Sequence, residues 1–127
     1  MIDYHKWRFK NYGGWDQDVE RSARVTLAKS SELLSAFGEK RKIVHGHLPL
    51  AYAKKHGLEE CKLLQYGQAI GFEDKDCRLG KWVLENVERL SEIGLYMKSL
   101  IETHASEDEE PYVWFQIVPP KCGSRIF

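Results

Sequence analysis

Two histidines separated by a single glycine, His45 and His47, form the first candidate site in the sequence. If residues 42–45 begin an extended strand, side chains two positions apart point to the same face, and both imidazoles could reach one metal ion or one phosphate. A metal ion needs a further ligand, and the nearest candidates in the sequence are His56, Glu59, Glu60 and Cys61. A pair of surface histidines beside a turn is the favoured interpretation, and a small metal- or phosphate-site enzyme is the alternative.

A second candidate lies at the start of the chain, where residues 2–9 alternate aromatic and cationic side chains. Rings that stack on bases and cations that hold phosphates are the two components of single-strand binding proteins. In a strand, however, Lys6, Arg8 and Lys10 share one face, and Trp7 points to the other. The alternation therefore favours an aromatic row in the core with a solvated basic face, and nucleic-acid binding is the alternative.

Residues 53–58 resemble the turn of a helix-turn-helix, because an alanine precedes a glycine by four positions and apolar side chains follow. Lys54 and Lys55 would add positive charge to such a unit. The second helix would begin at Glu59 and Glu60, which places carboxylates where the phosphates and base edges lie. A plain structural pair of helices is therefore favoured over a DNA-binding unit.

The leading hypothesis is a small non-catalytic binding protein that acts on another macromolecule, most simply a protein. Aromatic residues make up 12 % of the chain, and Trp, Tyr and Arg are the residues that anchor interfaces. The candidate anchors are Trp7, Trp15, Tyr52 and Trp82. An inhibitor, an immunity-type protein or a phage accessory protein would fit this description. A homodimer closed through sheet edges is also compatible with it.

The cysteines do not indicate a disulfide framework or a zinc knuckle, because there are three of them at wide spacings. We interpret Cys61, Cys77 and Cys122 as reduced thiols with structural roles. The sequence contains no recognisable order of nucleophile, base and acid, no phosphate-binding glycine loop and no paired acidic motif. It therefore identifies no catalytic residue and no cofactor, and favours a protein that is not an enzyme.

The elements that must position these side chains are predicted from hydrophobic periodicity and from capping residues. Asp16 can cap a helix that ends at Gly38, with Val19, Ala23 and Leu27 on its apolar face. The other predictions are strands over 2–9, 42–45 and 112–118, a short helix over 50–56, a segment over 63–72 that is either strand or helix, a long helix over 81–104, and an acidic loop over 107–110.

This order of elements predicts one α+β domain spanning residues 1–127. Strand, helix, strand, small helical insertion, strand, helix and strand match the ferredoxin-like βαββαβ pattern. The alternative is a mainly helical domain in which only the two ends of the chain pair as strands. Either architecture hosts many unrelated functions, so the fold by itself does not select one.

Composition narrows the classes of function further. The chain has 127 residues and 14.8 kDa, with 19 basic and 19 acidic side chains and a pI near 7. Binding to polyanions through bulk positive charge is excluded, since it requires an excess of Lys and Arg. The longest mostly apolar stretch, residues 112–118, is too short to span a bilayer, and the first residues lack a signal sequence. We therefore expect a soluble cytosolic protein.

Overall fold

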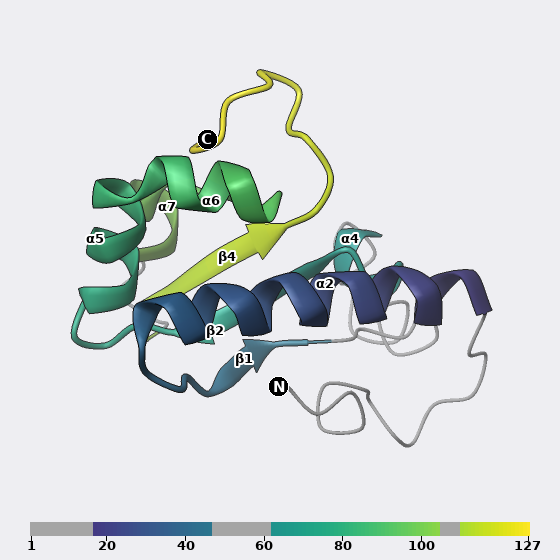
Figure 1. Cartoon of the computed structure of the whole chain (residues 1–127), viewed down its shortest axis with the longest axis horizontal. Helices are drawn as coiled ribbons and strands as arrows, with labels where there is room; N and C mark the ends of the chain where they lie inside the picture. The colour runs from purple at the N-terminus through teal and green to yellow at the C-terminus, as the bar shows by residue number, and fades with distance from the viewer. Residues whose placement is uncertain (1–16, 47–61, 105–109) are drawn as a thin grey trace.

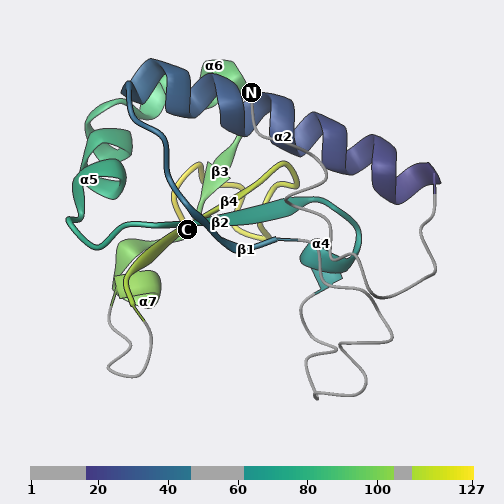
Figure 2. The same ribbon diagram turned by 90° about the horizontal axis from the view of Figure 1, so that it is seen from below.

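A long helix lies across one face of a four-stranded antiparallel sheet, and the short helices within residues 78–104 pack towards one end (Figures 1 and 2). The computed structural model describes residues 17–46, 62–104 and 110–127. Along the chain the elements are α2 (Gln17–Phe37), β1 (Ile43–His45), α4 (Lys62–Gln65), β2 (Ala69–Glu73), α5 (Arg78–Glu85), α6 (Val87–Ile93), β3 (Tyr96–Met97), α7 (Leu100–His104) and β4 (Tyr112–Gln116).

Helix α2 is the element that covers the sheet, and its prediction from periodicity is confirmed. Ala23, Leu27 and Leu34 are buried on one stripe, as the four- and seven-residue spacings predict. The stripe is wider than its apolar residues suggest, because Thr26 is fully buried as well. Its hydroxyl donates a hydrogen bond of 2.7 Å to the carbonyl oxygen of Gly67, which ties the middle of α2 to the turn before β2.

The sheet has the order β1-β2-β4-β3, and its centre is the pairing of β2 with β4. Five residue pairs join these strands in unbroken register, from Ala69 opposite Gln116 to Glu73 opposite Tyr112. The predicted strands over 42–45 and 112–118 are thus confirmed, the second in a central position. The segment 125–127 extends the sheet beyond β3, since the N–H of Met97 donates to the carbonyl oxygen of Arg125.

The α+β class is confirmed, but the strand order differs from that of a ferredoxin-like sheet. In that arrangement the first strand of the chain lies between the third and the last. Here β2 and β4 pair directly, so no strand separates them. The strand expected over residues 2–9 lies outside the described residues, as do the helix over 50–56, the segment 53–58 and residues 107–109 of the acidic loop.

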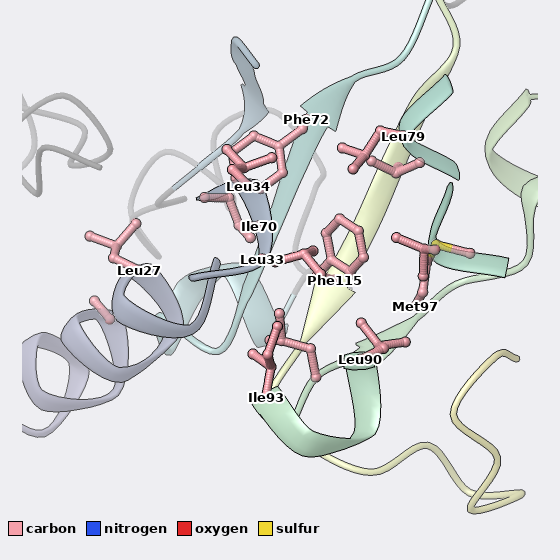
Figure 3. Close-up of a cluster of buried hydrophobic side chains, with 14 residues drawn as sticks. Leu27, Leu33, Leu34, Ile70, Phe72, Leu79, Leu90, Ile93, Met97 and Phe115 are labelled. Carbon is pink, nitrogen blue, oxygen red and sulfur yellow. The ribbon is translucent and has the colours of Figure 1, made fainter. Parts of the chain in front are cut away.

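The hydrophobic core lies between α2 and the sheet, with further side chains from α5, α6 and β3 (Figure 3). The rings of Phe72 and Phe115, on the two central strands, are 6.3 Å apart between centroids and are fully buried. Leu33 and Leu34 of α2 and Leu90 of α6 close the core around them. Removing an aromatic ring from such a core costs about 3–5 kcal/mol, so these two positions hold the sheet and helices together.

The segment 63–72, which the sequence predicted to be either strand or helix, contains one of each. Helix α4 occupies Lys62–Gln65, a turn follows, and β2 begins at Ala69. Gly67 lies in the turn with a φ of +70°, which ends the helix and redirects the chain into the sheet. Each periodicity was therefore correct for part of the segment.

The single long helix predicted over 81–104 is wrong, because the segment is divided among four elements. Helix α5 ends at Glu85, and the side-chain amide of the C-cap residue, Asn86, donates to the carbonyl oxygen of Trp82 at 2.8 Å. Helix α6 ends at Ile93, and its C-cap residue, Gly94, has a φ of +91°. Leu95 and Met97 then enter the sheet region and are fully buried, whereas Ile101 is 81 % exposed. Within the part of the chain that the structure describes, no helix is long and apolar enough to cross a membrane.

The break at Gly94 gives a prediction whose sign depends on the fold. In a continuous helix, Gly94→Ala would stabilise the protein by about 1 kcal/mol. At a positive φ, the same change costs about 1–2 kcal/mol, because the added Cβ disfavours the left-handed conformation. We expect a lower free energy of unfolding in urea. Gly38→Ala is the matched control, because Gly38 has a φ of +93° and an added Cβ there meets no atom within 4 Å. A stabilised Gly94→Ala variant would contradict the fold described here.

Candidate functional site

A buried aspartate at the end of β2 organises the junction between the sheet and α5. Asp74 is fully buried, and its carboxylate accepts hydrogen bonds from the backbone N–H groups of Leu79 and Gly80, each at 3.0 Å. The first N–H groups of a helix have no partner within the helix, so a side-chain acceptor must supply one. Asp74 does this for α5 from outside the helix, whereas the N-cap residue, Cys77, makes no side-chain capping bond.

Cys77 occupies the turn between Asp74 and α5 in an unusual backbone conformation. Its φ of 60° and ψ of 11° lie in the left-handed region, where it is the one residue other than glycine among those described. The Cys77 N–H donates to the carbonyl oxygen of Asp74 at 3.0 Å, which closes the turn. A left-handed conformation costs a residue with a side chain about 1–3 kcal/mol, and such strain is concentrated at functional sites.

The thiol of Cys77 contacts a histidine from the far end of α7. The Cys77 Sγ lies 3.3 Å from Nδ1 of His104, whose side chain is 14 % exposed. On the other side of the ring, Nε2 lies 3.3 Å from Oδ2 of Asp74. That approach is close enough for an ion pair, although the groups are not aligned as a hydrogen bond. Cys77, His104 and Asp74 thus form a continuous row, which we call the thiol site.

A close approach between α5 and α7 holds the thiol site together, and Gly80 permits it. A Cβ at Gly80 would lie 2.7 Å from a methyl carbon of Leu100 in α7 and 3.0 Å from the carboxylate of Asp74. Both contacts are shorter than real Cβ atoms tolerate without a shift of their neighbours. The absence of a side chain therefore brings α7, and with it His104, against the start of α5 (Figure 2).

This arrangement has the parts of an activated nucleophile. A thiol within reach of an imidazole can transfer its proton, and the thiolate is the reactive form of cysteine. A carboxylate at the opposite ring nitrogen fixes the orientation of the imidazole and stabilises its positive charge after proton transfer. The first backbone turn of α5 places the thiol at the positive end of that helix.

Four charged side chains surround the turn that carries Cys77. Arg41 Nη1 lies 3.1 Å from Oδ1 of Asp76, and its Nη2 lies 3.2 Å from Glu39, while Arg78 Nη1 lies 2.7 Å from the other oxygen of Glu39. Arg41 is only 11 % exposed and sits 5.2 Å from the Phe37 ring centroid. The hydrogen bond from Arg41 is the main reason that the pKa of Asp76 is lowered.

The histidine site predicted from the sequence is described only at His45. Its ring stands edge-on to Tyr112 at 4.6 Å and tilted towards Trp114 at 6.3 Å, so it packs on the sheet surface beside β4. His47, His56 and Cys61 lie outside the described residues. Among residues 17–46, 62–104 and 110–127, no group of three or more potential ligands could hold a metal ion. The metal or phosphate site stays a prediction.

The predicted partner-binding and nucleic-acid-binding residues lie mostly outside the described parts of the chain. Trp82 is described, and its half-buried ring packs edge-on against Phe37 with centroids 5.7 Å apart, at the border of the core. It therefore contributes to packing. The remaining residues of these two sets are Trp7, Trp15, Tyr52, Lys6, Arg8, Lys10, Lys54 and Lys55, and their roles stay predictions.

The thiol site itself was missed by the sequence analysis. Cys77 was interpreted as a structural thiol, and no role was given to Asp74 or to His104, which follows Cys77 by 27 residues. The available signal was local: an aspartate three positions before a cysteine and a glycine three positions after it, at the start of an amphipathic segment. Comparison with protein-family models, with curated proteins and with solved structures finds no match for this chain.

The lowered pKa of Asp76 predicts a pH dependence of stability. A carboxyl group whose pKa is lower in the folded than in the unfolded state stabilises the protein fully above its unfolded pKa, about 3.9, and loses that effect as pH falls through the folded pKa. We therefore expect Asp76→Asn to lower the urea midpoint near neutral pH and to differ progressively less from the unmodified protein below about pH 4.

The matched control for this measurement is Glu110→Gln. Glu110 also faces a cation, Lys75 at 3.3 Å, but both side chains are more than half exposed, so the pair should contribute little. A midpoint difference for Asp76→Asn that is the same at every pH would show that the charge of Asp76 is not involved.

Proposed function

We propose that this protein is a thiol-dependent enzyme in which Cys77 is the nucleophile, His104 its general base and Asp74 the positioning residue. The observation that carries the proposal is the row of contacts in the thiol site. Cys77 Sγ lies 3.3 Å from one nitrogen of His104, and the other nitrogen lies 3.3 Å from a fully buried carboxylate. A nucleophile, a base within reach and a group that orients the base together define a covalent catalytic site.

The first step follows from these contacts. The thiol proton of Cys77 moves to Nδ1 of His104, and the resulting imidazolium is stabilised by the carboxylate of Asp74 on its far side. The thiolate then attacks an electrophilic atom of the substrate. His104 Nδ1–H remains next to the reacting sulfur and can protonate the group that leaves.

The backbone at Cys77 supports a functional role over a structural one. Glycine is the most stable residue at a left-handed turn position, so a cysteine there lowers stability. Its presence in spite of this cost indicates that its side chain has a function. The side chain is also only partly buried and contacts an imidazole, whereas structural thiols are usually buried among apolar groups. A nucleophilic thiol must stay reduced, which is consistent with the cytosolic location expected from the sequence.

The role of a binding protein, which the sequence favoured, stays a second prediction. A macromolecular partner, most simply a protein, would be compatible with a catalytic thiol, and so would a homodimer. The described residues supply no specific contact for either, because Trp82 packs against the core and the other expected anchors lie outside the described ranges. The thiol site is therefore the stronger basis for a function.

The proposal predicts that Cys77 is alkylated faster than an ordinary thiol. In a Cys61→Ser, Cys122→Ser variant, Cys77 is the sole thiol, and its reaction rate with iodoacetamide can be followed by mass spectrometry. We expect Cys77 to react about tenfold or more faster near neutral pH than Cys122 in a Cys61→Ser, Cys77→Ser variant, since a thiol without a base is only slightly ionised there.

Variants of the two partners separate activation from structure. His104→Gln and Asp74→Asn should each slow alkylation of Cys77 near neutral pH, but not at about pH 10, where thiols ionise without a base. The control is His45→Gln, which removes an imidazole on β1 and should leave the rate unchanged. Equal rates for Cys77 and Cys122, or no effect of His104→Gln in a variant that is still folded, would refute the proposed function.

A further inference from the structure

The backbone amides around the thiol site are already engaged within the protein. The Cys77 N–H donates to the carbonyl oxygen of Asp74, and that of Arg78 donates to Oδ1 of Asp76 at 3.2 Å. The next two amides, of Leu79 and Gly80, donate to the carboxylate of Asp74, and the amide after those donates to the carbonyl oxygen of Cys77. Every backbone N–H from position 77 to 81 therefore has a partner before any substrate is present.

The engagement of these backbone N–H groups matters because different reactions of a thiolate place negative charge on different atoms of the substrate. Attack on a carbonyl carbon moves the negative charge to the carbonyl oxygen, where backbone N–H groups beside the nucleophile normally stabilise it, and each such donor contributes about 10²–10³ in rate. The leaving group of that reaction needs a second donor. At the thiol site, His104 can donate either to the carbonyl oxygen or to the leaving group. The backbone amides that would donate to the other of these two are bound to Asp74 and Asp76.

Attack on a peroxide has a simpler requirement. The thiolate attacks one oxygen, the O–O bond breaks, and the negative charge appears only on the oxygen that leaves. A single proton donor beside the sulfur meets that need, and His104 Nδ1, at 3.3 Å from Cys77 Sγ, is placed to provide it. The geometry therefore suits a substrate that accepts two electrons at oxygen better than one that forms a tetrahedral oxyanion on carbon.

We infer that the substrate of the thiol site is a hydroperoxide, and that Cys77 cycles through a sulfenic acid; this inference rests on the proposed function. The Cys77 thiolate attacks the outer peroxide oxygen and forms an S–O bond as the O–O bond breaks. The leaving alkoxide or hydroxide takes the proton held by His104, which gives an alcohol or water. Sulfur is oxidised by two electrons, and the peroxide is reduced by two.

A low-molecular-weight thiol returns Cys77 to its starting state in two further steps. Its sulfur condenses with the sulfenic acid to give a mixed disulfide, and water is released. A second molecule of the same thiol attacks the mixed disulfide, which regenerates the Cys77 thiol and releases the oxidised small disulfide. The whole cycle consumes one hydroperoxide and two small thiols, so protons and electrons balance.

The test uses the variant in which Cys77 is the sole thiol, full length, with hydrogen peroxide as the probe and dimedone to trap sulfenic acid. We expect trapping at Cys77 about tenfold or more faster than at Cys122 in the matching variant, and a loss of this advantage in His104→Gln. In a parallel reaction with p-nitrophenyl acetate, we expect His104→Gln to slow acylation of Cys77 by no more than it slows alkylation by iodoacetamide. His104 then contributes only by forming the thiolate, because the backbone amides of residues 77–81 are engaged elsewhere.

The outcomes separate this inference from the proposed function. Rapid alkylation of Cys77 by iodoacetamide, with peroxide reacting no faster at Cys77 than at Cys122, overturns the inference and leaves the nucleophile in place. Acylation of Cys77 that is slowed by His104→Gln more strongly than alkylation is slowed also overturns it, in favour of acyl transfer. If alkylation itself shows no activation of Cys77, both the inference and the proposed function fail.

Discussion

The buried carboxylate of Asp74 is the interaction on which the rest of this structure depends. An ionised carboxylate cannot be removed from water unless hydrogen bonds and charges replace its hydration. Two amides of α5 and the imidazole of His104 supply that replacement. The backbone of Asp74 adds two further links, because its N–H donates to the carbonyl oxygen of Pro111 and its carbonyl accepts from Cys77. One residue thus joins the end of β2, the start of α5, the end of α7 and the approach to β4.

The strained turn at Cys77 follows from the same arrangement. For Asp74 to reach the amides of Leu79 and Gly80, the chain must reverse direction within three residues, and the left-handed conformation of Cys77 achieves this. The cost of about 1–3 kcal/mol is offset by hydrogen bonds to a charged group, each of which contributes about 1.5–3 kcal/mol. The ion pairs of Arg41 hold the outer side of the turn. The backbone that carries the thiol is consequently held in place by contacts within the protein.

Local patterns in the sequence predicted the helices and strands that bury one apolar face. They did not predict the places where the chain changes direction. Helix α2, β1 and β4 followed from periodicity and capping, because each presents an apolar face to a single core. The thiol site was not predicted, since no spacing rule relates Cys77 to His104 across 27 residues. Only the turn from Asp74 to Gly80 is marked by a local pattern, the spacing of its aspartate, cysteine and glycine. That pattern indicates the start of a helix and does not by itself indicate a functional site. Which side chain meets the thiol is decided by tertiary packing.

The wrong prediction for residues 81–104 and the missed site have the same physical cause. In one continuous helix, a rise of about 1.5 Å per residue would place His104 roughly 40 Å from Cys77 along the axis. The breaks at Asn86 and Gly94 fold the segment back, and the pairing of β3 with β4 fixes the return, so that α7 packs against the first turn of α5. Leu90 and Met97 remain at helical spacing although the helix ends between them, because both face the same core from different elements. The interruption of the apparent helix is therefore what brings the imidazole to within 3.3 Å of the thiol.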